Sequence, residues 1–560
     1  MQGNDAGQRC GIIAGGSLHP DDTTVGAEMR IRWRPALGAV VTLAFLATVI
    51  YGVNVGPSRP NVALTVVAGS ELADVLNDPE LMSDLRDQTG VTLDATYRGT
   101  LDGADRLVSG ERYDLAWFSS DHYLTLLSRA RNIPEPVSSE PVMRSPVVLG
   151  VTRSAAAELG WIDSPVTWSD VAERAGRGEL RFAMTSPASS NSGFSALVGV
   201  AASFDPTPGG PLRAEDIDGA RLTELFSGLT TTAGSSRYLT DTFLRQQDRI
   251  DAVINYESEL LALNANPALR EPLKLIYPSD GAVYADYPLT LVNPARAAAY
   301  HSVLDWLREP DTQRQLSEVT NRRPVDESVP RDEAIPDQSP PGLPLPADLT
   351  TADQLIFSYL DEFRRPARTF YVLDVSTSML GPRITDLRRA FADLTGTDTS
   401  VTGQFARFRK NELVTIIPFA SAVQPSRDFL IRDPELEPQV LIDLRAYVDG
   451  LPLGPGTALY DGLAAAYDRV QQDAAANEGY YTSIVLMTDG EANTGLDLSG
   501  FRARFEQSGM GSLNVPTFVV KFGEAQEAEL REVAALAGGE LFDATTGSLR
   551  TAFQEIRGYQ

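Results

Sequence analysis

Cysteine and histidine are scarce in this sequence. Cys10 is the only cysteine among 560 residues, so no disulfide can form within the chain and no thiolate cluster can bind a metal. The three histidines, His19, His122 and His301, are widely separated, and none accompanies a G-x-S-x-G nucleophile motif. The sequence therefore lacks the patterns typical of a Ser-His-Asp hydrolase.

Positive charge is also in short supply. Lysine and arginine number 48 against 75 aspartates and glutamates, which gives a net charge of -27. Such an acidic chain is not expected to bind nucleic acid, whereas divalent cations and cationic ligands suit it better. The hydrophobic share of 43% and the charged share of 22% are ordinary for folded protein, and the length predicts two or three domains.

One long apolar run interrupts the polar N-terminal region. Residues 36–55 carry no charge and are long enough to span a bilayer as a helix, and three arginines lie between residues 30 and 34. This pattern predicts an uncleaved signal anchor, with a cytoplasmic, disordered segment at 1–35 and the rest of the chain extracytoplasmic. A cleaved signal peptide is the alternative, although no clean A-x-A site follows the run. Met29 is an alternative start.

A second domain is expected over residues 60–325. Its apolar strands repeatedly run through a polar turn into a helix, which predicts a parallel α/β sheet. The segments with this pattern are 62–72, 113–124, 145–151, 181–197, 249–261 and 273–292. Together they resemble the bilobed periplasmic solute-binding proteins, a family that takes oxyanions and other small solutes.

Polar residues stand where these strands give way to helices, and helix N-termini attract anions. Serine and asparagine are also the commonest helix caps, so each residue alone is explained as a cap unless several meet in one cleft. A small anionic or polar solute is the expected ligand. The candidates are Ser70, Ser119, Ser120, Ser190 and Asn191, and, on weaker grounds, Asn255, Tyr256 and Tyr284 on the far wall.

Proline marks the boundary to the last domain. Seven prolines occur between residues 324 and 346, so a linker or a surface strap is expected at 326–350. Apolar residues at helical spacing follow at 352–364, which predicts a lead-in helix packed on the last domain at 351–560.

The strongest motif opens this last domain. The stretch TFYVLDVSTSM, residues 369–379, runs as an apolar strand into a loop that carries Asp374, Ser376 and Ser378. Open α/β sheets bind ligands at the carboxyl ends of their strands. Carboxylate and hydroxyl oxygens suit Mg²⁺, Mn²⁺ or Ca²⁺ rather than a soft metal.

Two later stretches complete the pattern. GPGTALYD, residues 454–461, contains Thr457, and SIVLMTDGEANTG, residues 483–495, ends a strand at Asp489. This order resembles the metal-ion-dependent adhesion site of von Willebrand factor type A (VWA) domains, although Thr377 stands where the family often has glycine. In that family two serines and a threonine bind the ion directly and two aspartates act through water. By motif these positions are Asp374, Ser376, Ser378, Thr457 and Asp489.

This resemblance implies a doubly wound, Rossmann-like sheet with Mg²⁺ (or Mn²⁺ or Ca²⁺) at its edge. A Glu or Asp from a protein partner would complete the coordination of the ion. The leading hypothesis is therefore a membrane-anchored extracytoplasmic binding protein whose first domain senses or presents a solute.

Two other functions compete with this hypothesis. One is a transporter-type solute receptor with the metal-site domain as a docking appendage. The other is a metal-dependent hydrolase, which the missing general base disfavours, since Glu491 is readily explained as a solvated acid. The chain is expected not to be an enzyme.

Overall fold

The computed structural model describes residues 61–205, 210–523, 525–545 and 549–560 of the chain. The predicted anchor at 36–55 and the segment 1–35 lie outside these residues. Among the described residues, no helix is both long and apolar enough to cross a membrane.

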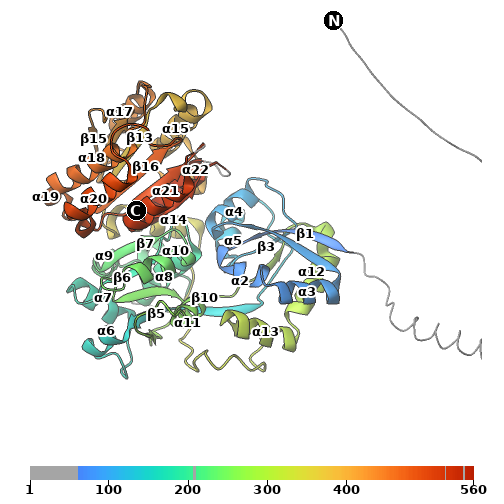
Figure 1. Cartoon of the computed structure of the whole chain (residues 1–560). Helices are drawn as coiled ribbons and strands as arrows, with labels where there is room; N and C mark the ends of the chain where they lie inside the picture. The colour runs from blue at the N-terminus through green and yellow to red at the C-terminus, as the bar shows by residue number, and fades with distance from the viewer. Residues whose placement is uncertain (1–60, 206–209, 524, 546–548) are drawn as a thin grey trace, which may run out of the picture. The chain divides into compact units, whose positions relative to one another are not determined.

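The first domain has two lobes, each built on its own sheet (Figure 1). In the first lobe the strand order is β2-β1-β3-β11-β4, in which β1 is parallel to β2 and β3, and β11 is antiparallel to β3 and β4. The strands are β1 (Val62–Ala68), β2 (Val91–Tyr97), β3 (Leu115–Trp117), β4 (Ser138–Glu140) and β11 (Leu289–Leu291). The helices are α2 (Ala73–Leu76), α3 (Pro79–Thr89), α4 (Thr100–Val108), α5 (His122–Ala130), α12 (Ala297–Leu307) and α13 (Pro310–Thr320).

The second lobe is organised around one long strand, β5 (Met143–Thr152). The strand order is β10-β5-β8-β6-β7, and β9 and β12 also pair with β5. The other strands are β6 (Phe182–Thr185), β7 (Leu229–Ala233), β8 (Ala252–Tyr256), β9 (Leu273–Ile276), β10 (Tyr284–Ala285) and β12 (Arg323–Pro324). The helices are α6 (Arg153–Glu158), α7 (Trp168–Gly176), α8 (Asn191–Ser203), α9 (Gly219–Ser227), α10 (Ser236–Arg245) and α11 (Glu257–Asn264).

Both sheets are mixed, so the prediction of a parallel sheet is only partly right. In the second lobe β6 is parallel to β7 and β8, whereas β5 is antiparallel to β8, β9, β10 and β12. The chain passes between the lobes three times, at β4 to β5, at β10 to β11 and at α13 to β12. β5 and β11 enter their sheets from the other lobe and run away from the lobe junction, whereas β8 and β3 run towards it, so these pairs are antiparallel.

The proline-rich segment after β12 packs as a strap on the first domain. Val329 and Ile335 are buried, and single bridges join Gly342 to Ala282 and Pro346 to Leu212. Since the prolines donate no backbone hydrogen bond, the strap is held by isolated bridges and side chains rather than by a continuous ladder.

The last domain contains a six-stranded sheet in the order β15-β14-β13-β16-β17-β18. All neighbouring pairs are parallel except β14 and β15. The strands are β13 (Ala367–Asp374), β14 (Glu412–Phe419), β15 (Arg427–Ile431), β16 (Tyr481–Thr488), β17 (Thr517–Lys521) and β18 (Leu541–Asp543). This is the doubly wound sheet that the motif order predicts.

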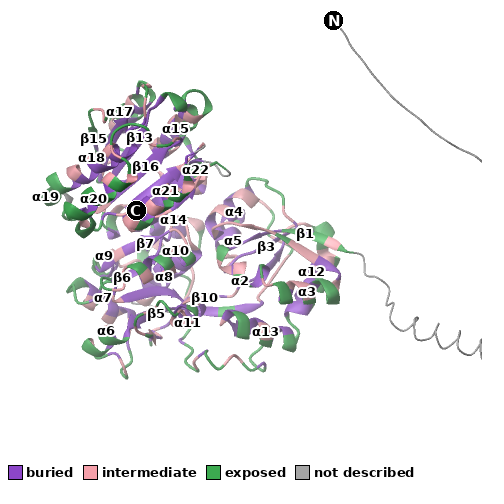
Figure 2. Ribbon diagram, in the orientation of Figure 1, coloured by how far each residue is buried: buried purple, intermediate pink, exposed green. Residues whose placement is uncertain are grey.

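Helices cover both faces of this sheet (Figure 1). Alternate side chains of β13 point to opposite faces, so Tyr371 and Leu373 pack with α15, α17 and α22, whereas Phe370 and Val372 pack with α18, α20 and α21. The central strands are buried and the outer turns of the helices are exposed (Figure 2). The helices are α15 (Pro382–Ala392), α16 (Val401–Ala406), α17 (Gln439–Asp449), α18 (Leu459–Gln472), α19 (Ala474–Asn477), α20 (Leu498–Gln507), α21 (Glu527–Leu536) and α22 (Leu549–Tyr559).

The predicted lead-in helix is α14 (Leu349–Ser358), extended by a π-helical turn at Tyr359–Phe363. Tyr359 lies 5.0 Å from Phe226 of α9 between ring centroids, and Phe357 lies 5.2 Å from Phe405 of α16. The helix therefore packs on both domains, and the prediction that it packs on the last domain is incomplete. Its apolar spacing identifies a buried face, not the partner of that face.

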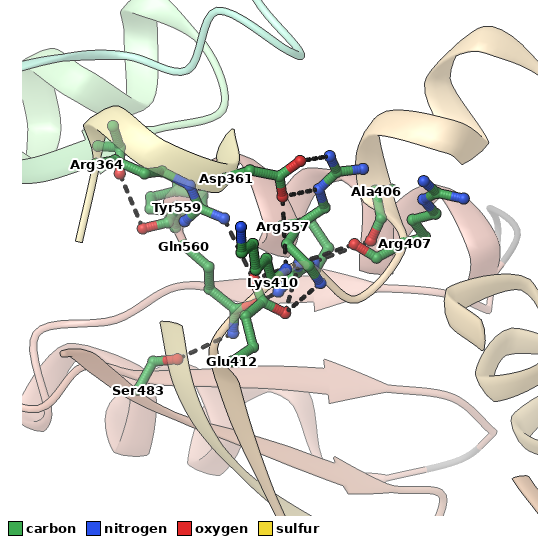
Figure 3. A network of polar contacts seen from close by, with 12 residues as sticks. Asp361, Arg364, Ala406, Arg407, Lys410, Glu412, Ser483, Arg557, Tyr559 and Gln560 are labelled. Carbon is green, nitrogen blue, oxygen red and sulfur yellow. Dashed lines mark hydrogen bonds and ion pairs between the residues drawn. The ribbon is translucent and has the colours of Figure 1, made fainter. Parts of the chain in front are cut away.

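The C-terminal helix α22 is fixed by a buried polar network (Figure 3). Arg557 donates to the carbonyl oxygens of Ala406 and Arg407 at 2.9 and 3.0 Å. The Gln560 side chain donates to Ser483 Oγ of β16 at 2.9 Å. These bonds hold α22 against one face of the sheet, beside α15.

Candidate metal centre

β13 brings Asp374 to the carboxyl edge of the sheet. Every residue of the strand is buried, because it lies between β14 and β16 and is covered on both faces. The Asp374 side chain accepts from the Ser376 N–H and from Thr488 Oγ1, both at 2.8 Å. Its own loop and the neighbouring strand thus position both carboxylate oxygens.

The next loop residues continue this chain of hydrogen bonds to Asp489. Ser376 Oγ and Ser378 Oγ are 2.7 Å apart, and Ser378 Oγ donates to Asp489 Oδ1 at 2.8 Å. β16 is the parallel neighbour of β13, with Met487 paired to Leu373, so the two strands end together. Four of the five predicted metal residues therefore meet at one point of the sheet edge.

Thr457 reaches the same edge through its backbone. Its N–H donates to Asn493 Oδ1 at 2.9 Å, and Asn493 belongs to the loop that follows Asp489. In the same loop as Thr457, the Gly454 N–H donates to the Val375 carbonyl at 2.9 Å. Thr457 is buried, and its loop contacts both of the other loops of the site.

The centre concentrates negative charge in a buried place. Asp374 and Asp489 have side chains that are almost inaccessible to solvent. Burial raises the pKa of Asp374, hydrogen bonds from Ser376 and Thr488 oppose this rise, and the nearby Asp489 charge adds to it. Arg383, in the first turn of α15, donates to Asp489 Oδ2 at 2.6 Å.

The donor set is chemically suited to a hard divalent cation. Two carboxylates and the hydroxyls of two serines converge, with a threonine in the adjoining loop, and all of these groups offer oxygen. Oxygen ligands of this kind match Mg²⁺, Mn²⁺ and Ca²⁺. Arg383 pairs with Asp489, but within the part of the chain that the structure describes Asp374 has no ion pair, so a cation would complete the neutralisation of the site.

A second polar cluster lies where the two lobes of the first domain meet. Tyr256, at the end of β8, donates to Ser119 Oγ at 3.1 Å, and the Asn191 side chain donates to the Tyr256 hydroxyl at 2.8 Å. Ser119 follows β3 of the first lobe, whereas Asn191 begins α8 of the second. The structure thus brings three of the predicted solute residues together across the lobe junction.

The other three solute candidates have local roles. Ser70 is exposed beside β1. Ser120 Oγ accepts from the His122 N–H at 3.2 Å, where the chain enters α5. Ser190 precedes α8, and its hydroxyl lies 3.1 Å from Ser192 Oγ.

Of the two remaining far-wall candidates, Asn255 adjoins this cluster and Tyr284 contacts the strap. Asn255 Oδ1 accepts from Ser236 Oγ and from the Tyr256 N–H, at 3.2 and 2.9 Å. Tyr284 donates to the Pro340 carbonyl of the strap at 2.8 Å. Asn255 therefore orders the end of β8, and Tyr284 anchors the strap.

Comparison with known families agrees with this division of the chain. Residues 64–318 match the family model described as bacterial extracellular solute-binding protein, and residues 370–555 match that of the von Willebrand factor type A domain. One chain therefore carries a solute-binding domain and a VWA domain. No curated protein matches the chain.

Several solved structures are similar to about half of the chain. The periplasmic binding protein AfuA from Actinobacillus pleuropneumoniae shares 12% identity, covering 54% of this chain and 99% of its own, with a TM-score of 0.43. The sulfate-binding protein SubI from Mycobacterium tuberculosis shares 20% identity, covering 52% and 96%, with a TM-score of 0.39. The ferric binding protein from Campylobacter jejuni shares 13% identity, covering 52% and 96%, with a TM-score of 0.40.

In the VWA domain, sequence reasoning missed Thr488, Asn493 and Arg383. Thr488 and Asn493 flank Asp489 in the sequence, and only their hydrogen bonds reveal that they position Asp374 and the Thr457 loop. Arg383 had a weak signal, because a cation in the first turn of a helix opposes the helix dipole. Such a placement indicates a nearby anion that compensates for it.

In the solute-binding domain, the missed residues are charged and lie close to Tyr256. Arg322 is buried and donates to Asp74 Oδ2 at 2.6 Å and to the Glu71 carbonyl at 2.8 Å. Its guanidinium lies 4.6 Å from the ring centre of Tyr287, which has a φ of 45° and packs 6.1 Å from Tyr256. A non-glycine residue with positive φ is held there by its surroundings, a feature common at binding sites.

Proposed function

We propose that the chain is an extracytoplasmic binding protein whose VWA domain holds a protein partner through a divalent cation, while its first domain binds a small solute. In this proposal Ser376, Ser378 and Thr457 would hold the ion directly, and Asp374 and Asp489 would support it. The ion would offer its open coordination to a carboxylate of the partner. The cofactor is Mg²⁺, with Mn²⁺ or Ca²⁺ as alternatives.

One observation carries this proposal. Asp374, Ser376, Ser378 and Asp489 come from two different strands and join in a single hydrogen-bonded chain at the carboxyl edge of the sheet. A surface loop of small polar residues does not require two buried carboxylates, which are costly without a cation. A binding role is favoured over catalysis, since Glu491, the nearest candidate base in sequence, is exposed.

The test is partner capture by the purified full-length chain from extracytoplasmic extracts, in Mg²⁺ and in chelator. We expect capture in Mg²⁺ only, and expect Ser376→Ala to lose it. Ser499→Ala is the matched control, because Ser499 is an exposed serine of the same domain whose hydroxyl donates to Asp497. Capture that is equal in chelator and in Mg²⁺ rejects the metal-dependent mechanism.

A solute receptor that serves a transporter is the second candidate. It is supported by the Tyr256, Ser119 and Asn191 contact, which joins the two lobes at the ends of β3, β8 and α8. Polar side chains that meet across two lobes are suited to close on a small polar solute. A thermal-shift screen of the full chain against small solutes tests this role, because a ligand of the folded state alone raises the melting temperature.

We further propose that residues 36–55 anchor the protein in the cell membrane as a single span, with the two domains extracytoplasmic. The support is the uncharged run and the arginines that precede it. Membrane pellets washed with high salt should retain the protein with residues 30–34 still attached. A mature N-terminus that begins after residue 55 rejects the anchor.

A further inference from the structure

We infer that Arg383 is a resident cation of the VWA site, which pairs with Asp489 and competes with the divalent ion for that carboxylate. This inference rests on the proposed metal-dependent function. It assigns to Arg383 the control of the site's affinity for the divalent ion.

The side chains of Arg383 and Asp489 are in direct contact, and the Asp489 side chain is the buried one of the two. Arg383 Nη1 donates to Asp489 Oδ2 at 2.6 Å and lies 3.4 Å from the Ser378 carbonyl oxygen. The Asp489 side chain is fully buried, whereas 35% of the Arg383 side chain is exposed. The other oxygen, Asp489 Oδ1, accepts from Ser378 Oγ, so both oxygens are already engaged.

The position of Arg383 is unfavourable for its helix and is therefore explained by the site. α15 begins at Pro382, so the guanidinium stands in the first turn, where the helix dipole repels a cation. The Asp489 carboxylate offsets this cost. A charge-assisted hydrogen bond in a buried place is stronger than one on the surface.

Gly523 leaves the space that the guanidinium fills. Its φ is +82°, and a Cβ atom there would lie 2.9 Å from Arg383 Cζ and 3.1 Å from Asp489 Cβ. Any larger residue would push the arginine away from Asp489. The loop after β17 is thus shaped to admit this side chain.

Arg383 also has room to leave Asp489. It lines a cavity of about 560 Å³ whose walls include Asp386, one turn further along α15, and Arg389. Asp386 already accepts from Arg389 at 2.9 Å, so it does not need Arg383 as a partner. Because 35% of the Arg383 side chain is exposed, a divalent ion that attracts Asp489 would displace the guanidinium into this water-accessible space.

The experiment is a titration of the purified full-length chain with Mg²⁺ by calorimetry, comparing the natural protein with Arg383→Gln and Arg389→Gln. Both variants remove one positive charge from α15, but Arg389 pairs with Asp386 and not with Asp489. We expect Arg383→Gln to bind Mg²⁺ about tenfold more tightly, because a unit charge a few ångströms away is removed. We expect Arg389→Gln to bind about as the natural protein does.

Thermal unfolding in chelator provides the second measurement. Arg383→Gln should melt below Arg389→Gln, because a buried carboxylate has lost its partner, and Mg²⁺ should raise its melting temperature more than that of the natural protein. Equal Mg²⁺ affinities in all three proteins overturn the inference and leave the proposed function standing. Absence of Mg²⁺ binding in all three proteins overturns both.

Discussion

Glu412, the first residue of β14, accepts two hydrogen bonds from Arg557 Nη2 of the C-terminal helix, at 2.7 and 2.9 Å (Figure 3). Both side chains are buried, and Arg364 donates to the same carboxylate at 3.2 Å. Burial alone would raise the pKa of Glu412, but the two arginines outweigh it and hold the pKa below its usual value. Glu412, Arg557 and Arg364 together join three segments that are distant in sequence.

Removal of this carboxylate should be costly. Glu412→Ala leaves Arg557 and Arg364 buried without their anion, and loss of one partner of a buried pair costs about 3–5 kcal/mol of unfolding free energy. Glu435→Ala is the control, since Glu435 pairs with Arg407 on the surface and should cost about 0–1 kcal/mol. Urea unfolding of the two variants measures the difference. Equal losses would mean that the Glu412 network adds nothing to stability.

The lobe junction gives a second prediction. Tyr256→Phe removes the hydroxyl that joins Ser119 to Asn191, and it should cost about 1–2 kcal/mol, because buried polar groups lose a partner. Tyr97→Phe is the matched control, since its hydroxyl bonds Asn77 in an exposed position and should matter little. Melting temperatures of both variants test this. If the two variants melt alike, the hydroxyl of Tyr256 does not hold the lobes together.

Glu259, in the first turn of α11, gives a pH prediction. Burial is the main cause that raises its pKa from 4.5 to about 7, opposed by Arg322 and assisted by Asp74. An acid with a raised pKa in the folded state contributes stability below its unfolded pKa and loses it as pH rises through the folded value. The natural protein should therefore lose stability between about pH 4.5 and 7.

Glu259→Gln cannot ionise and should lack this loss. We expect it to gain about 1–3 kcal/mol relative to the natural protein at pH 8 and little at pH 4.5, a range that allows for partial solvent access to the side chain. Unfolding curves at the two pH values provide the measurement, with Asp311→Asn, an exposed acid, as control. A constant difference between variant and natural protein across the pH range contradicts the assignment.

The central strands of the VWA sheet were predictable from the sequence, whereas its two edge strands were not. β13 and β16 are long apolar runs between polar loops, and this pattern places them in the centre of a sheet. β15 escaped prediction because only Phe429 and Ile431 are buried in its five residues. β18 is three residues long and gives no periodic signal.

The residues of the metal site were likewise only partly predictable from the sequence. Asp374, Ser376, Ser378 and Asp489 follow directly from motif order, since parallel strands end at one edge. Arg383 enters from the helix after the motif, and the distance between its guanidinium and Asp489 depends on how α15 packs. In the first domain, Ser119 and Asn191 meet at the Tyr256 hydroxyl, whereas Ser70 and Ser120 stay predictions, because a polar residue at a helix start can either bind an anion or cap the helix.

Loss of the divalent ion is the last prediction. Asp374→Asn keeps the shape of the side chain but removes its charge, so the Mg²⁺-induced rise in melting temperature should disappear. With few charged ligands, a dissociation constant on the order of 0.1 to 1 mM is expected, and at ten times that concentration the natural protein should gain about 1.4 kcal/mol. Asp386→Asn removes the same charge from the exposed surface of α15 and should keep the full gain. Burial raises the pKa of Asp374, so the gain should also shrink in the natural protein as pH falls. An equal gain in Asp374→Asn and in Asp386→Asn would place the ion away from Asp374.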